Sequence, residues 1–328
     1  MLQKPPEVPG AEQLVLASDI TRALGSEVRL RRAAERGVFH RLARGAYLRS
    51  EIWHQLTSTE RYALRVRAAG LERRGEAVIS HESAAALWGL PVLAAWPAEV
   101  HLLTERRAGG RSKPGIRKHA LGIAAEDVTV IDGLQVTTVS RTVIDLAATL
   151  DLKSAVAAVD RALFVDRLGR YQPMATKAEL LEAWERMLPF RGSVRARSVI
   201  EFGTHLSGSP LESGSRVNIA LSGFPEPELQ HPFDADGKYY EGDFYWREFD
   251  AVGEADGRGK YFDPRMLAGK SPEEVVYSEK VREDAIRRMV KGFTRWDFAI
   301  GMNQYRLRAR LLELGLPMTR RRLQLAAR

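Results

Sequence analysis

Four carboxylates recur at matching intervals along two adjacent stretches that the residue pattern predicts to be β-strands. If a two-residue turn forms at 248–249, Asp243 stands directly opposite Glu254, and Glu241 stands opposite Asp256. Because side chains alternate between the faces of a strand, all four acids then share one face. Like charges directly opposite each other destabilise a sheet, so the pattern predicts a cation at this face.

Mg²⁺ is the expected cation, because it takes carboxylate oxygens while keeping water and phosphate oxygens in its shell. Asp243 and Glu254 are the predicted metal ligands, and the bound Mg²⁺ lowers the pKa of a water that attacks a phosphate. Lys260 or Lys280 is expected to orient that water or stabilise the developing charge. Glu212, on the predicted preceding helix, is a third carboxylate. A one-residue slip in the turn breaks the Asp243–Glu254 pairing.

The stretch 15–50 predicts a helix, a turn, an arginine-rich helix and a basic hairpin that bends near Arg44-Gly45. Ser18 and Ser26 are the expected N-caps of the two helices. This order is typical of a winged helix-turn-helix, whose second helix enters the major groove of DNA. An ordinary helix pair with a solvated basic face is the alternative. The predicted DNA-binding side chains are Arg29, Arg31, Arg32, Arg36, Arg41 and Arg44.

The whole chain is expected to be an α/β multidomain protein of ordinary globular composition, with 45% hydrophobic and 28% charged residues among 328. Strand and helix signals alternate through the middle of the chain and again near its C-terminal end. The expected segments are a disordered N-terminus at 1–14, a winged helix-turn-helix at 15–50, a mixed α/β domain at 51–165, a connector at 166–195, a second α/β domain at 196–300, and a basic C-terminal helix and tail at 301–328.

Composition narrows the classes of function. The net charge of +8 favours a polyanionic partner such as nucleic acid, although a basic surface kept for solubility is the alternative. The absence of cysteine excludes disulfides, thiolate zinc sites and cysteine catalysis. No secretory signal or membrane-length apolar run is evident, so a cytoplasmic protein without membrane contact is expected. Ser80-His81 is interpreted as a cap or packing pair, because no partner base or carboxylate lies at an informative spacing.

An ordered set of motifs in the C-terminal part resembles the PD-(D/E)XK nuclease superfamily, closest to the branch related to very-short-patch-repair endonucleases. The set is Glu212, Asp243, Glu254-Ala255-Asp256-Gly257, Lys260-Tyr261, Glu279-Lys280-Val281-Arg282-Glu283-Asp284 and Thr294-Arg295-Trp296. The resemblance implies a restriction-endonuclease-like α/β core at 196–300, with Asp243 and Glu254 as Mg²⁺ ligands. Asp256 stands where the family has lysine, so Lys260 or Lys280 would substitute, or the centre no longer cuts. Arg282 and Arg295 would contact phosphate or pair with the acids.

The first half resembles AbiEi-type antitoxins of type IV toxin–antitoxin systems. The motifs are SDITRALG and VFHRLARGAYL, followed by ISHESAAALWGLP and VTTVSRTVIDLA. That resemblance implies double-stranded DNA as a partner, a role in transcriptional regulation, and a cognate toxin as a possible second partner. Two functions follow from the sequence: a DNA-binding regulator with an Mg²⁺-dependent endonuclease domain, or a regulator with a degenerate, non-catalytic nuclease domain. A purely structural acidic hairpin is the third interpretation.

Overall fold

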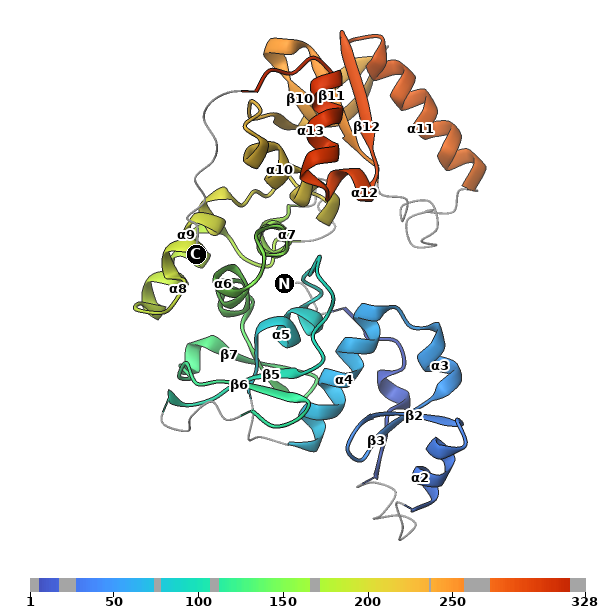
Figure 1. Cartoon of the computed structure of the whole chain (residues 1–328), viewed down its shortest axis with the longest axis vertical. Helices are drawn as coiled ribbons and strands as arrows, with labels where there is room; N and C mark the ends of the chain where they lie inside the picture. Colours follow the sequence, from blue (N-terminus) through green and yellow to red (C-terminus); the bar gives the residue numbers. More distant parts are fainter. Residues whose placement is uncertain are drawn as a thin grey trace.

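The computed structural model arranges the chain as three regions stacked along its long axis (Figure 1). A small sheet lies at one end, a sheet covered by helices lies in the middle, and a four-stranded sheet lies at the other end. Among the described residues, no helix is both long enough and apolar enough to cross a membrane. The structure describes residues 6–17, 28–73, 78–106, 112–165, 172–235, 237–256 and 272–318.

The N-terminal region is a three-stranded antiparallel sheet of order β1-β3-β2 with the arginine-rich helix beside it. The predicted hairpin is present, and Gly45 supplies the left-handed residue of its bend at φ 71°. The helix predicted after Ser18 lies outside the described residues. The elements are η1 (Ala11–Gln13), β1 (Val15–Leu16), α2 (Val28–Glu35), β2 (Phe39–Ala43), β3 (Ala46–Arg49) and α3 (Ser50–Gln55).

Residues 6–14 fold against the rest of the chain, so the expectation of a disordered N-terminus is wrong for this segment. Val8 is buried at 7% exposure and packs in the same apolar core as Leu48, Leu56 and Tyr62. The prolines and glycine around Val8 concealed this contact in the sequence, because a single apolar residue in an irregular segment carries no periodicity.

The middle region is a five-stranded mixed sheet of order β6-β5-β4-β8-β7. A capping box of Thr57 and Glu60 starts α4, and Gly89 ends α5 in the left-handed conformation. The elements are α4 (Ser58–Glu72), β4 (Val78–Ile79), α5 (His81–Trp88), β5 (Val100–Leu103), β6 (Ile116–His119), η3 (Ala125–Asp127), β7 (Val128–Ile131) and β8 (Leu134–Thr137).

A helical layer follows the middle sheet and includes the segment that was expected to be a connector. Trp184 and Leu180 of this segment are buried in one core with Val143, Val156 and other residues of the preceding helices. The connector prediction at 166–195 is therefore wrong for residues 172–195, because their apolar residues pack as an integral part of the layer. The helices are α6 (Val139–Thr149), α7 (Leu152–Leu163), α8 (Lys177–Met187) and α9 (Ser193–Phe202).

The C-terminal region is a four-stranded sheet of order β12-β11-β10-β9, in which only β12 runs parallel to its neighbour β11. The buried Trp246 and Trp296 form its apolar core together with α10 and α13. The elements are α10 (Pro210–Ser222), β9 (Glu228–Ala235), β10 (Lys238–Trp246), η4 (Arg247–Phe249), β11 (Ala251–Ala255), α11 (Pro272–Arg287), β12 (Gly292–Trp296), α12 (Phe298–Gly301) and α13 (Gln304–Glu313). Residues 319–328 of the basic tail lie outside the described residues.

Candidate functional site

The β10–β11 hairpin has the register that the sequence predicts, although its turn is different. The pairs Phe244–Gly253, Tyr245–Val252 and Trp246–Ala251 have the predicted register, and Asp243 and Glu254 come next on their strands, just beyond the last paired residues. The two-residue turn is wrong: a short 3₁₀ helix and the left-handed Asp250, at φ 48°, connect the strands. A four-residue connection with the same midpoint as a two-residue one preserves the pairing, which is why the register held.

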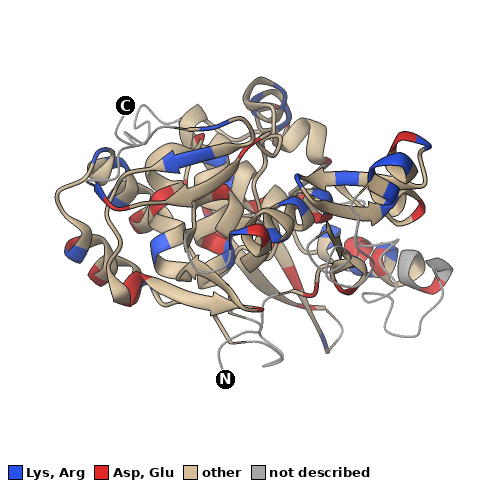
Figure 2. Cartoon of the chain, turned by 90° about the horizontal axis from the view of Figure 1, so that it is seen from below, with Lys and Arg blue, Asp and Glu red and all other residues tan. Residues whose placement is uncertain are grey.

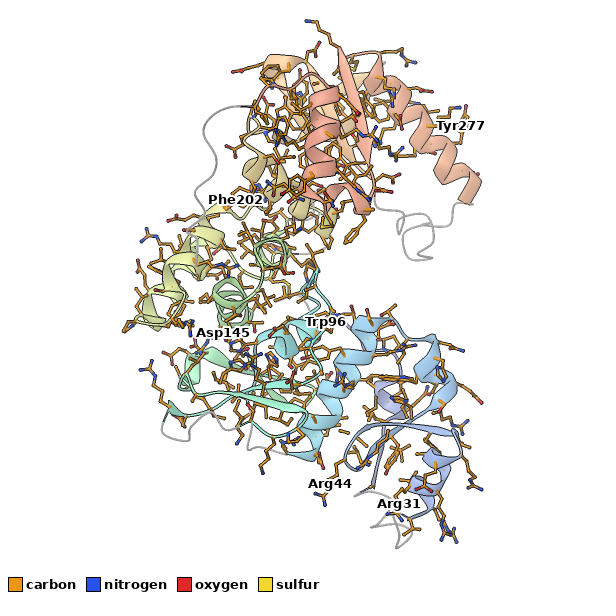
Figure 3. All side chains as sticks on the ribbon, in the orientation of Figure 1. Arg31, Arg44, Trp96, Asp145, Phe202 and Tyr277 are labelled. Atoms are coloured by element: carbon orange, nitrogen blue, oxygen red, sulfur yellow. The ribbon has the colours of Figure 1, made fainter. Side chains whose placement is uncertain are left out.

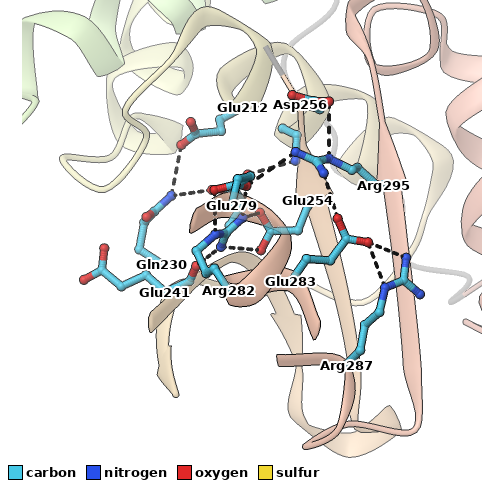
Figure 4. A network of polar contacts seen from close by, with 12 residues as sticks. Glu212, Gln230, Glu241, Glu254, Asp256, Glu279, Arg282, Glu283, Arg287 and Arg295 are labelled. Carbon is cyan, nitrogen blue, oxygen red and sulfur yellow. Dashed lines mark hydrogen bonds and ion pairs between the residues drawn. The ribbon is translucent and has the colours of Figure 1, made fainter. Parts of the chain in front are cut away.

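Glu254 is buried at 4% exposure and is held by a guanidinium from α11 (Figure 4). Arg282 donates from Nη2 to Oε2 at 2.8 Å and from Nη1 to Oε1 at 3.3 Å. Burial and the negative charge of Asp243 raise the pKa of Glu254 to about 7, although Arg282 acts in the opposite direction. The guanidinium of Arg282 is therefore the cation that faces the Glu254 carboxylate.

Asp243 and Glu212 are brought together by an amide. Gln230 of β9 donates from Nε2 to Glu212 Oε2 and to Asp243 Oδ1, each at 3.1 Å. The second oxygen of Asp243 accepts from the Ala255 backbone N–H at 2.8 Å. Gln230 therefore links the carboxylates of α10 and β10, and Glu254 lies on the neighbouring inner strand β11.

Glu212 also has a structural role at the start of its own helix. It accepts from the Gly208 backbone N–H at 2.9 Å and from the Ser209 hydroxyl at 2.7 Å. Ser209 in turn caps α10 by accepting from the Glu212 N–H. A buried carboxylate in the first turn of a helix is stabilised by these donors and by the helix dipole. This capping role explains part of its burial without any ligand.

Gln230 is a site residue that sequence reasoning missed. Its backbone has φ 51°, a conformation that costs about 1–3 kcal/mol for a residue with a side chain. The β9–β10 pairing continues on both sides of it but omits the Gln230–Asp243 pair. No composition or periodicity signal marks such a bend within a strand, so a structure was needed to find it.

Asp256, at the position where the family resemblance has lysine, faces an arginine. Arg295 of β12 approaches Asp256 Oδ2 from Nε at 3.3 Å, and it also pairs with Glu283 at 2.7 Å and Glu279 at 3.4 Å. Arg282 contacts Glu279 at 2.6 Å, which joins both arginines into one network of alternating charge (Figure 4). Of the two roles expected for Arg282 and Arg295, pairing with the acidic cluster is the one present here.

Of the two candidate lysines, only Lys280 lies within the described residues. Lys260 lies outside the described residues. Lys280 is exposed on α11, and no hydrogen bond or ion pair joins it to Glu212, Asp243 or Glu254. Within the described ranges, no group of three histidine or acidic residues has a geometry suited to a metal ion.

The oxygen-only donor set of Asp243 and Glu254 fits Mg²⁺ by its chemistry. However, each of their four carboxylate oxygens already accepts a hydrogen bond from Gln230, Arg282 or a backbone N–H. A metal ion binding here would share these oxygens with the hydrogen-bond donors or displace one of them.

The predicted DNA-binding arginines form an exposed basic face at the opposite end of the molecule (Figures 2 and 3). Arg31 is only loosely paired, at 3.8 Å from Glu35 across one turn of α2. Such an exposed pair is worth at most about 1 kcal/mol and leaves the guanidinium available. Arg29, Arg31, Arg32 and Arg36 lie exposed on α2 or just after it, and Arg41 and Arg44 lie exposed on the hairpin.

Comparisons with known proteins give distant relatives. No protein-family model matches the chain. It is similar to two proteins of Mycobacterium tuberculosis, Uncharacterized protein MT2308 of strain CDC 1551 / Oshkosh and Uncharacterized protein Rv2248 of strain ATCC 25618 / H37Rv. Each is 27% identical over 198 residues, which cover 60% of this chain and 69% of the relative.

Proposed function

We propose that this protein binds double-stranded DNA through the basic face of α2 and the β2–β3 hairpin. The supporting observation is that six predicted arginines are all exposed there, on a helix and a hairpin that adjoin each other. Guanidiniums on such a face neutralise phosphates and release counter-ions, which gives affinity that falls with salt. The AbiEi resemblance extends the proposal to a transcriptional regulator of that type, with a cognate toxin as a second partner.

The C-terminal region, in this proposal, is a nuclease-like domain whose centre is closed and does not cut DNA. The single observation that carries this is the bidentate contact of Arg282 with Glu254, because a guanidinium occupies the side of the carboxylate that a metal ion needs. The acid Asp256 in place of lysine, paired with Arg295, supports the same conclusion. The four-stranded sheet with α10 and α11 is compatible with the α/β core that the nuclease resemblance implies.

Mg²⁺-dependent hydrolysis is the second candidate, and the convergence of three carboxylates favours it. Glu212 and Asp243 share the amide of the strained Gln230, and Asp243 lies close enough to Glu254 to raise the pKa of that carboxyl. Bound there, Mg²⁺ would supply an activated water and charge stabilisation at a phosphate. In that case Asp243 and Glu254 would hold the ion after Arg282 has moved to the DNA backbone.

The DNA-binding proposal is tested with the Arg31→Ala/Arg32→Ala double variant and fluorescence anisotropy on a labelled duplex over a series of salt concentrations. Loss of two phosphate contacts should weaken binding and reduce the slope of log K against log salt by about 2. Arg308→Ala, which removes one exposed arginine from α13, serves as the control for charge loss elsewhere. Unchanged affinity and slope in the double variant would remove the basic face from the proposal.

A further inference from the structure

A large cavity in the middle of the molecule belongs to neither of the sites above. Its volume is about 1410 Å³, and three segments far apart in the sequence line it. They are residues 117–127 between β6 and β7, residues 141–152 at the end of α6, and residues 186–195 between α8 and α9. Ligand sites are concave, partly apolar and furnished with a few convergent polar groups, so the lining decides what this cavity is.

A buried charged network lies at one wall of the cavity. Arg141, at 4% exposure, donates from Nη1 to Asp127 Oδ2 at 2.9 Å and from Nε to Asp145 Oδ1 at 3.1 Å. Figure 3 labels Asp145 in this middle region. Burial raises the pKa of Asp145 to about 6, with Arg141 opposing the shift. Buried ion pairs are weak contributors to stability, so their place against a cavity points to a role in binding.

Histidines stack beside this network. His81 is buried at 2% exposure in the left-handed conformation, at φ 51°, and its ring lies 3.7 Å from that of His119 with an angle of 14° between the planes. His119 approaches His101 with 3.3 Å between Nε2 and Nδ1. Burial lowers the pKa values of His81 and His119 to about 3 each, so both rings are neutral near pH 7. A strained, buried residue next to a cavity is a candidate for function.

Two familiar chemistries do not fit this cluster. A serine–histidine–aspartate relay needs the serine and the carboxylate on different ring nitrogens. Here Ser80 Oγ, at 3.1 Å, and Asp145 Oδ2, at 3.8 Å, both approach Nδ1 of His81. A metal site does not fit either, because no group of three histidine or acidic residues among the described residues has a geometry suited to a metal ion. The Ser80 side chain makes no cap hydrogen bond at α5, and Asp145 is a carboxylate partner of His81 that the sequence spacing did not reveal.

Positive charge dominates the lining. Six arginines and four acidic residues face the cavity. Three of the acids are engaged: Asp127 and Asp145 hold Arg141, and Asp151 caps α7. In contrast, Arg117 and Arg191 are exposed on two different segments that line the cavity, and no carboxylate among the described residues forms an ion pair with either of them.

Apolar side chains complete the wall. Ile123, Leu152 and Phe190 are among the lining residues. We propose that this cavity binds a small organic anion, whose carboxylate or phosphate group is held by Arg117 and Arg191 and whose apolar body lies against these side chains. A guanidinium presents a planar fork of donors that suits both oxyanions. This site is separate from the basic face of α2 and from the carboxylates of the C-terminal sheet.

Isothermal titration calorimetry with two probes tests the proposal on the full-length protein. Phenyl phosphate represents a phosphate ligand and phthalate represents a carboxylate ligand, while phenol is the uncharged control. We expect at least one of the anions to bind once per chain and phenol to bind much more weakly. Which anion binds more tightly then identifies the oxyanion that the site prefers.

The Arg117→Ala/Arg191→Ala double variant should bind the preferred anion at least about tenfold more weakly, since it loses two charge-assisted contacts. Arg308→Ala should leave the affinity unchanged, and thermal melting confirms that both variants are folded. Equal binding by the wild type and the double variant, or failure of both anions to saturate one site, would overturn the proposal. So would a matching loss of duplex DNA affinity without small-anion binding, because the arginines would then belong to a DNA surface.

Discussion

Replacing Arg282 with methionine removes the only cation that contacts both oxygens of Glu254 among the described residues. The same guanidinium holds Glu279 at 2.6 Å and the Glu241 carbonyl at 2.8 Å, so several acceptors lose their donor together. Breaking one partner of a buried ion pair costs about 3–5 kcal/mol. Because the Arg282 side chain is 21% exposed, we expect the lower end, about 3 kcal/mol of unfolding free energy.

The loss of unfolding free energy in Arg282→Met should depend on pH, because the pKa of Glu254 determines where the carboxylate becomes ionised. Its pKa in the folded protein is raised from 4.5 to about 7, so its ionised form weakens the fold as pH rises through 7. Without Arg282 the pKa rises further, because a contact that favours the charged form is gone. The deficit of Arg282→Met relative to the wild type should therefore be largest above pH 7 and shrink below it.

Urea denaturation at a series of pH values, followed by far-ultraviolet circular dichroism, measures both quantities. Lys280→Met is the matched control, because it removes one positive charge from an exposed position of the same helix. The control should change the unfolding free energy by less than about 0.5 kcal/mol. If Arg282→Met is as stable as Lys280→Met, or if its loss of unfolding free energy does not vary with pH, Arg282 does not neutralise the charge of the buried Glu254. That result would refute the proposal that Arg282 closes the carboxylate site.

Three further changes have distinct expected outcomes. Gln230→Ala removes the amide donor of Asp243 Oδ1 and one of the two donors of Glu212 Oε2, and it should lower the unfolding free energy by about 1–3 kcal/mol in urea titrations, whereas no change would mean that solvent replaces the amide. Gly253→Ala places a Cβ 2.5 Å from the Trp296 ring and should cost about 1–3 kcal/mol through overpacking, seen as a lower melting temperature with altered tryptophan fluorescence. In the folded wild type the pKa of His119 is lowered to about 3, so the protein loses about 1.4 kcal/mol of unfolding free energy per pH unit as the pH falls below 6.5. His119→Gln should remove this contribution. Parallel profiles of unfolding free energy against pH for the wild type and the variant would contradict this.

The sequence predicted the strands of the acidic hairpin and their register. Both depend on local properties: side chains alternate between the faces of a strand, and the midpoint of the turn determines which residues pair. Three residue pairs of the hairpin have the expected register, and Asp243 lies close enough to Glu254 to raise the pKa of that carboxyl. What the sequence could not specify is which cation meets them. Arg282 is 28 residues from Glu254 along the chain, and only the packing of α11 against the sheet brings its guanidinium to this carboxylate.

Longer-range features escaped prediction for related physical reasons. The sequence predicts a connector where α8 carries Trp184, because an amphipathic pattern does not identify the hydrophobic core against which a helix packs. The stacking of His81 on His119 brings together residues from different elements, and no spacing rule marks that pair. Likewise, the left-handed backbone of Gln230 is imposed by its contacts with two carboxylates and not by its residue type.

The closed-centre account is tested most directly by incubating the wild-type protein with supercoiled plasmid in the presence of Mg²⁺ or Mn²⁺, alongside Asp243→Ala and Glu254→Ala variants. Binding is followed by gel retardation in the same samples. The account predicts that the plasmid is retarded and stays supercoiled, with no difference in cleavage between the wild type and the variants. Metal-dependent nicking or linearisation by the wild type that either alanine variant abolishes would contradict it and establish the hydrolytic alternative.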